Sequence, residues 1–196
     1  ILVGGTGRVG RMLLWHWPVA GQLLTSQRRP AEAGLVWSPL DGPSALLQHL
    51  DKTGTQPRAM IVLAGVTPAP GVDEAALQGN SDLALASLSA ARAAGIDRVF
   101  LASSSAVYGV HPKGTAFAET SAVQPVNAYG RAKLAMEGAA QPFRGAGMQV
   151  CCLRIGNVAG ADALLHPLTA ATGAPRQPVR IDAFADGLGP LRSYIG

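Results

Sequence analysis

Short apolar runs alternate with longer Ala- and Leu-rich segments along the chain. A continuous apolar run at residues 59–64 predicts a buried strand, because side chains on both faces of such a strand avoid water. The other expected strands are 1–3, 22–26, 35–37, 98–103 and 149–155. The expected helices are the segment from the first glycines to about Trp15, then 44–50, 80–94 and 129–140, with Gly95 after the third and Pro142 closing the last.

This alternation of strand and helix predicts an α/β fold with a doubly wound parallel sheet. From about Gly156 the sequence becomes rich in Pro and Gly, which indicates an exit from the sheet. We therefore expect a nucleotide-binding domain at residues 1–160 and the start of a small C-terminal substrate-binding region at 161–196. The first residue already lies in a strand-like run, so we expect a fragment of a longer chain.

Composition narrows the class of protein. Hydrophobic residues make up 48% and charged residues 14%, which is typical of a globular chain. The net charge is +4, but the basic residues are scattered, so we expect no nucleic-acid partner. No apolar stretch could cross a membrane, no signal peptide is visible, and we expect no metal site. Cys151 and Cys152 read as small core residues rather than a disulfide, which makes the cytoplasm the default location.

Glycines spaced three apart join the first strand to the first helix. Gly4, Gly7 and Gly10 allow a tight turn, close approach of a ligand to bare backbone, and close packing of helix on strand. The start of the helix, with Arg8 and Val9, offers N–H groups and partial positive charge to phosphates. These five residues are predicted to bind a dinucleotide, although a purely structural tight turn has the same glycines.

The end of the second strand bears on the choice of cofactor. An acidic residue there would bind the ribose hydroxyl of NAD, whereas a basic one would accept the extra phosphate of NADP. Residues 25–29 contain no acid and end in Arg28 and Arg29, which favours NADP over NAD. The alternative is that both arginines lie in a solvated loop. Asp41 could bind the adenine amino group, or could be a turn residue before Pro43.

The candidate chemistry lies in Ser103–Ser105 and in Tyr129 with Lys133. The serines end a strand, at the carboxyl edge where ligands bind in such sheets. Tyr129 and Lys133 are four residues apart, so a helix places them on one face. A nearby ammonium should lower the pKa of the phenol, and such a tyrosine can move protons at a hydroxyl or carbonyl carbon. The pattern predicts hydride chemistry by the cofactor on a small-molecule substrate.

These pieces resemble the extended short-chain dehydrogenases/reductases of the NAD-dependent epimerase/dehydratase family, which have the Rossmann fold. The resemblance covers essentially the whole chain. Its motifs are Gly-Gly-Thr-Gly-Arg-Val-Gly at 4–10, Leu-Ala-Gly at 63–65, Asn80, Ser-Ser-Ser-Ala-Val-Tyr-Gly at 103–109, Glu119, Pro125, Asn-Ala-Tyr-Gly-Arg-Ala-Lys at 127–133, Glu137, Leu-Arg-Ile-Gly-Asn-Val at 153–158 and Gly-Pro-Leu-Arg-Ser-Tyr-Ile at 189–195.

The resemblance implies roles for the central residues. Tyr129 would be the acid/base, and Lys133 would bind the nicotinamide ribose and tune Tyr129. Ser104 would orient the substrate oxygen, with Ser105 as the substitute. Family members often pair through helices that include the one with Tyr129, so the resemblance also implies a homodimer as one assembly.

Further residues are assigned in the same way. Ala64 and Gly65 would line the cofactor through backbone groups. Asn157 and Arg192 would face a nucleotide-sugar substrate, with Arg192 near its phosphates. The alternatives are a turn cap for Asn157 and a surface ion pair for Arg192.

Two departures from the family pattern limit the chemistry. Sugar-nucleotide dehydratases carry an Asp-Glu pair where this chain has Ser105 and Ala106, so we expect no dehydration. The closing motif usually has Asp after its arginine and continues further, whereas here Ser193 follows and the sequence stops at Gly196. Substrate identity is therefore not predicted.

Three functions remain open. The first is an NAD(P)-dependent epimerase or oxidoreductase acting on a sugar, nucleotide-linked by analogy. The second is an NADPH-dependent carbonyl reductase, favoured by Arg28 and Arg29. The third is a dinucleotide-sensing binding protein without catalysis, against which Ser104, Tyr129 and Lys133 argue.

Overall fold

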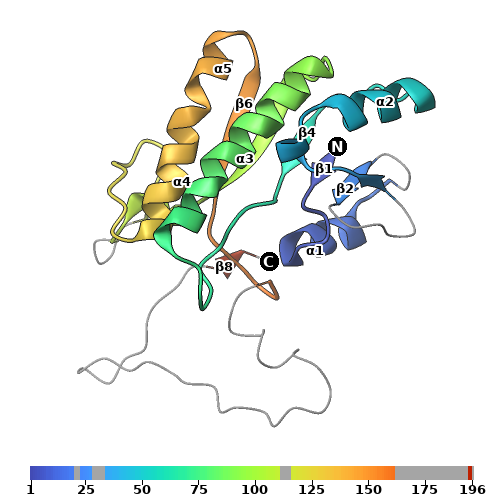
Figure 1. Cartoon of the computed structure of the whole chain (residues 1–196). Helices are drawn as coiled ribbons and strands as arrows, with labels where there is room; N and C mark the ends of the chain where they lie inside the picture. The colour runs from blue at the N-terminus through green and yellow to red at the C-terminus, as the bar shows by residue number, and fades with distance from the viewer. Residues whose placement is uncertain (20–22, 28–33, 111–115, 162–193, 196) are drawn as a thin grey trace, which may run out of the picture. The chain divides into compact units, whose positions relative to one another are not determined.

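The computed structural model describes residues 1–19, 23–27, 34–110, 116–161 and 194–195 (Figure 1). The chain divides into two compact units, Ile1–Ile155 and Gly156–Gly196. In the second unit, β7 (Asn157–Val158) pairs in parallel with β8 (Tyr194–Ile195). Among the described residues, no helix combines the length and the apolar character that a membrane span requires.

A six-stranded parallel sheet forms the centre of the first unit. Its strand order is β3-β2-β1-β4-β5-β6. The strands are β1 (Leu2–Val3), β2 (Thr25–Gln27), β3 (Leu35–Val36), β4 (Met60–Val62), β5 (Arg98–Ser104) and β6 (Gln149–Ile155). This order confirms the predicted doubly wound sheet. The direction of winding reverses between β1 and β4, and ligands bind beyond the carboxyl ends of strands at such a reversal.

The helices follow the strands along the chain. They are α1 (Arg8–His16), α2 (Ser44–Thr53), α3 (Glu74–Ala93), α4 (Ala128–Ala139) and α5 (Gln141–Gly145), with 3-10 turns η1 (Pro39–Asp41) and η2 (Ser105–Tyr108). Figure 1 shows α3 and α4 side by side, and the two helices contact each other extensively. The sheet and helices share one apolar core, which includes Met60, Leu88, Leu101 and Met136.

Two predicted helix boundaries are wrong for identifiable reasons. Helix α3 begins at Glu74 rather than residue 80, because the Asp73 carboxylate accepts a hydrogen bond from the Ala76 N–H over 2.8 Å and caps the helix there. Pro142 does not simply close α4. It occupies the first turn of α5, a position where proline removes no helical hydrogen bond.

Strand β6 is mostly exposed or half-buried. It is the outermost strand of the sheet next to β5, and of its seven residues only Val150 is buried. Cys151 is exposed and Cys152 half-buried, so the expectation of two core cysteines is wrong for Cys151. An apolar run alone could not distinguish this outer strand from a central one.

Candidate active site

The glycine loop between β1 and α1 is closely packed against the end of β4. Gly4 has a φ of +90°, a left-handed conformation that favours glycine. A Cβ on Gly4 would lie 2.4 Å from the backbone nitrogen of Ala64, and a Cβ on Gly10 would lie 2.4 Å from the carbonyl oxygen of Gly4. The Gly7 N–H donates to that same carbonyl over 3.1 Å. The loop is therefore a bare-backbone turn that no larger residue could form unchanged at Gly4 or Gly10.

The start of α1 presents partial positive charge beside this loop. The N-cap is Gly7, which has no side chain to cap the free N–H groups of the helix. The first turn, which begins with Arg8 and Val9, contains no acidic residue. A helix N-terminus of this kind favours negative charge. Together with the space left by Gly4 and Gly10, this donor set fits the pyrophosphate of a dinucleotide.

The end of β4 connects the glycine loop to α4. The Leu63 and Ala64 N–H groups both donate to the carbonyl of Val3, over 2.8 and 3.1 Å, which fixes Ala64 beside the loop. The next residue, Gly65, is as confined as the loop itself. A Cβ on Gly65 would lie 2.6 Å from Oδ1 of Asn80 and 3.3 Å from Nζ of Lys133.

The candidate acid/base, Tyr129, lies on the first turn of α4. Asn127 caps this helix by accepting a hydrogen bond from the Gly130 N–H over 2.8 Å. The lack of a side chain at Gly130 lets the helix approach η2, since a Cβ there would lie 2.5 Å from the carbonyl oxygen of Ala106. The structure thereby places the Tyr129 phenol beside the hydroxyl of Ser104, the last residue of β5, close enough for the two groups to interact.

The hydroxyl of Ser104 has a second contact. It accepts a hydrogen bond from the Ala106 N–H over 3.2 Å and so caps η2. Ser105, the predicted substitute, is half-buried in η2. The carboxyl end of β5 thus holds Ser104 in place beside Tyr129.

Lys133 is buried one turn further along α4, with 4% of its surface exposed. Its ammonium donates to the carbonyl of Ala102 over 2.8 Å and to Oδ1 of Asn80 over 3.3 Å, and lies 5.8 Å from the centre of the Tyr129 ring. Burial lowers the pKa of Lys133 from 10.5 to about 8. The predicted trio of Ser104, Tyr129 and Lys133 is therefore brought together at one place.

The expected lowering of the Tyr129 pKa is wrong. Burial of the phenol raises its pKa above 10.0, and the hydrogen bond with Ser104 opposes this only in part. Lys133 is not among the groups that shift the tyrosine, because its ammonium is directed to Ala102 and Asn80. At neutral pH the phenol is accordingly protonated, in the form that donates a proton.

Asn80 holds this arrangement from α3, a role that the sequence did not predict. Its side chain is 2% exposed and accepts a hydrogen bond from the Val66 N–H over 3.0 Å. Its amide donates to the carbonyls of Val66 and Leu77, over 3.0 and 2.8 Å. Asn80 thus ties the end of β4 to Lys133. The available signal was an asparagine within an Ala-rich segment that was expected to be helical.

The remaining predicted residues are Asp41, Asn157 and three arginines. Asp41 is exposed at the end of η1, and Asn157 lies in β7 of the second unit. Arg28, Arg29 and Arg192 fall outside the described residues. Within the described part of the chain, no group of three or more His, Cys, Asp or Glu side chains could hold a metal ion.

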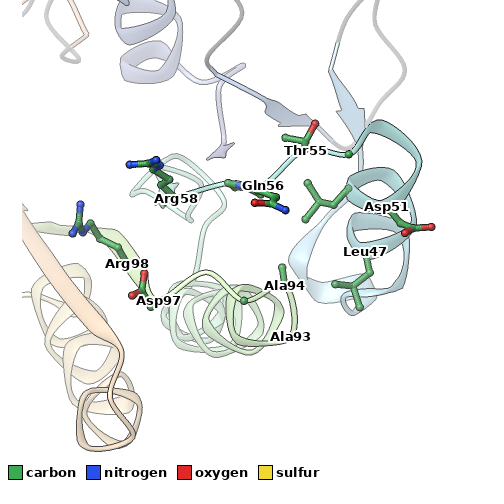
Figure 2. A pocket seen from close by; sticks show the side chains of 13 residues that line it. Leu47, Asp51, Thr55, Gln56, Arg58, Ala93, Ala94, Asp97 and Arg98 are labelled. Atoms are coloured by element: carbon green, nitrogen blue, oxygen red, sulfur yellow. The ribbon is translucent and has the colours of Figure 1, made fainter.

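A cavity of about 860 Å³ lies at the opposite edge of the sheet, where β4 and β5 begin (Figure 2). It is lined by the ends of α2 and α3 and by the residues that lead into the two strands, among them Asp51, Arg58, Asp97 and Arg98. These side chains are exposed. The cavity is therefore separate from Ser104, Tyr129 and Lys133, which lie at the carboxyl edge or on the helix that follows it.

Known proteins with this sequence pattern and fold include sugar-nucleotide epimerases. The chain is 32% identical over 180 residues to a UDP-glucose 4-epimerase of Azospirillum brasilense, covering 83% of this chain and 49% of that protein. It is 27% identical to a UDP-glucose 4-epimerase of Brucella ovis solved in complex with NAD, with a TM-score of 0.66, covering 82% and 52% of the two chains.

A third relative comes from Agrobacterium tumefaciens. It is a short-chain dehydrogenase/reductase superfamily protein with bound NAD, 26% identical, with a TM-score of 0.68 and coverage of 85% and 51%. The chain thus spans about half the length of these relatives. The model of the NAD-dependent epimerase/dehydratase family matches residues 1–174. With its glycine loop, parallel sheet and Ser104–Tyr129–Lys133 cluster in place, this chain belongs to that family.

Proposed function

We propose that this chain is the nucleotide-binding part of an NAD(P)-dependent epimerase or oxidoreductase that acts on a nucleotide-linked sugar. The observation that carries the proposal is the assembly of Ser104, Tyr129 and Lys133 next to Gly65 and the glycine loop. Relatives named as UDP-glucose 4-epimerases support the substrate class. The absence of acids at Ser105 and Ala106 argues against a dehydratase.

Tyr129, Ser104 and Lys133 have different roles in the proposed reaction. The bound dinucleotide would accept and return a hydride at the sugar carbon. Tyr129 donates a proton to, or takes one from, the oxygen on that carbon, and Ser104 holds the same oxygen by a hydrogen bond. Lys133, held by Ala102 and Asn80, places positive charge near the phenol ring whenever it is protonated. The pyrophosphate would lie on the glycine loop, at the N-terminus of α1.

For the cofactor we propose a preference for NADP over NAD. Strand β2 ends at Gln27, where an acid would select NAD, and Arg28 and Arg29 follow directly in the sequence. This favours the phosphate of NADP. It also favours the second candidate function, an NADPH-dependent carbonyl reductase, which would release its cofactor at each turnover.

The test uses the full-length protein that contains this chain. Purified protein is mixed with UDP-glucose, UDP-galactose and other nucleotide sugars, and nicotinamide absorbance and epimerised product are both measured. The proposal expects an epimer with tightly retained cofactor, or net oxidation or reduction of a nucleotide sugar. Reduction of simple carbonyl compounds with free exchange of NADPH would support the reductase instead. Tight dinucleotide binding without turnover of either class would contradict both and leave a binding protein.

A further inference from the structure

Helix α4 carries a third polar residue on the face that bears Tyr129 and Lys133. Glu137 follows Lys133 by one turn and is only 8% exposed. The Ser103 hydroxyl donates to Oε1 of Glu137 over 2.5 Å, and Ser103 is itself 4% exposed. Because Ser103 directly precedes Ser104 on β5, Glu137 fastens the acid/base helix to the strand that holds the substrate-orienting hydroxyl.

Arg154 completes this contact from the neighbouring strand. It lies opposite Ser103 in the register of β5 and β6, and its Nη2 donates to Oε2 of Glu137 over 2.8 Å while its Nε donates to Oε1 over 3.0 Å. The guanidinium carbon lies 4.8 Å from the centre of the Tyr108 ring, which stacks on Phe117 at 4.7 Å. Arg154 therefore joins α4, β6 and η2 at one point.

This placement is not explained by stability. Enclosing the Glu137 carboxylate, whose side chain is 10% exposed, and the half-buried Arg154 guanidinium, whose side chain is 24% exposed, costs part of their desolvation energy, and a well-packed apolar pair of similar volume is often as stable or more so. A bidentate Arg–carboxylate contact instead fixes the distance and angle between the two elements that carry the side chains. The elements that it fixes are those that carry Tyr129 and Ser104.

We propose that Glu137 and Arg154 are positioning residues that set the Tyr129 hydroxyl against the Ser104 hydroxyl. Neither touches the reacting atoms. They act through Ser103 on the end of β5 and through Tyr108 on η2, the turn that Ser104 caps. The proposal rests on the proposed function for its effect on turnover, but the geometry that it predicts can be measured without any substrate.

The first experiment compares two double substitutions, each of which removes an ion pair between α4 and a neighbouring element. Glu137→Met with Arg154→Met replaces this largely enclosed ion pair, with side chains 10% and 24% exposed, by apolar side chains. Glu74→Gln with Arg131→Gln removes an ion pair between α3 and α4 whose side chains are 55% and 50% exposed, respectively, and serves as the matched control. With UDP-glucose and UDP-galactose as probes, we expect the Met pair to lower kcat by about 10- to 100-fold, with KM and NADPH affinity within about twofold of wild type. The control should leave kcat unchanged.

A double-mutant cycle separates positioning from loss of stability. If the pair acts through Ser104, then in a Ser104→Ala background the Met pair should lower kcat by less than about threefold, because the contact that it positions is already gone. Full additivity, or a kcat that follows thermal unfolding alone, would overturn the proposal. Ser103→Ala is the milder variant. It removes one hydrogen bond and should lower kcat in the same direction if the Met pair does not fold.

A spectroscopic readout needs no substrate. The ¹³Cζ resonance of Tyr129 can be assigned by its loss in Tyr129→Phe. Ser104→Ala should shift the Tyr129 resonance by removing its hydrogen bond, and the Met pair or Ser103→Ala should shift it in the same direction. A Tyr129 resonance that moves in Ser104→Ala but stays at its wild-type position in both network variants would refute the positioning role. Failure of all nucleotide sugars to react, with these shifts observed, would instead refute only the proposed function.

Discussion

Gly10→Ala tests whether the glycine loop binds the dinucleotide in the way its packing indicates. The backbone of Gly10 does not have a positive φ, so alanine is acceptable there in conformation and only the contacts decide. The new Cβ would lie 2.4 Å from the carbonyl oxygen of Gly4 and 2.7 Å from Cα of Gly5, both backbone atoms that cannot rotate away. The start of α1 must therefore move by about 1 Å to restore an ordinary contact of 3.4 Å.

A shift of this size should weaken dinucleotide binding more than it lowers the free energy of unfolding. Overpacking costs about 1–3 kcal/mol, and the better helix propensity of alanine offsets about 1 kcal/mol of that. An N–H that donates to phosphate at about 2.9 Å would be moved to about 3.9 Å, beyond hydrogen-bonding distance. Loss of one such bond to a charged group costs about 1.5–3 kcal/mol, which corresponds to a loss of affinity of about 10- to 150-fold.

The assay is fluorescence titration of the full-length protein with NADH and NADPH, alongside thermal unfolding. Gly138→Ala is the matched control, because Gly138 is exposed on α4 and a Cβ there meets nothing within 4 Å. It should bind both dinucleotides as wild type does and unfold at the same or a higher temperature. Wild-type affinity of Gly10→Ala for both dinucleotides would refute the assignment of the loop as their phosphate site.

Three further predictions follow from the site. Lys133→Met removes the buried ammonium. Between pH of about 8 and 10.5, folded wild type binds fewer protons at Lys133 than unfolded wild type does. The free energy of unfolding of wild type relative to this variant should therefore rise with pH across that window. Urea titrations at about pH 7, 9 and 10 would measure this difference in unfolding free energy, and a difference that falls with pH would contradict the buried charge. Asn80→Ala leaves the part-buried N–H and carbonyl of Val66 without their side-chain partner and removes one of the two hydrogen bonds of the buried Lys133 ammonium, so it should cost about 2–4 kcal/mol of unfolding free energy, whereas a loss below about 0.5 kcal/mol would show that Asn80 holds nothing in place. Arg28→Ala with Arg29→Ala should weaken NADPH binding by about tenfold or more while leaving NADH binding within about twofold, and an unchanged preference for NADPH would refute the role of these arginines.

Much of the fold follows from local pattern. The alternation of strand and helix implies parallel strands with crossovers, and the doubly wound strand order was inferred on that basis. The glycine loop was predicted from three glycines spaced three apart at the first strand–helix junction, a position that favours a dinucleotide site over a purely structural turn. Tyr129 and Lys133 share a helix face by spacing alone, whereas the contact of Tyr129 with Ser104 is tertiary and entered only through the family resemblance.

The remainder depends on burial, which a single sequence does not reveal. The direction of the Tyr129 pKa was wrong because a nearby ammonium was expected to dominate, while desolvation of the phenol does. The burial of Asn80 and its contact with Lys133 arise only when α3 and α4 pack together. Asp73 is different: an aspartate before an Ala-rich segment is a cap signal, and it went unused in placing the start of α3.

Turnover by Tyr129→Phe tests the central claim most directly. The full-length variant and wild type would be compared for binding of NADPH and NADH and for conversion of the nucleotide sugar that the wild type accepts. The variant keeps the ring and its packing but loses the hydroxyl that contacts Ser104. The account predicts nearly normal dinucleotide binding with turnover reduced by about 10²- to 10⁴-fold, the contribution of a positioned proton donor. Turnover at the wild-type rate would contradict the assignment of Tyr129 as the acid/base.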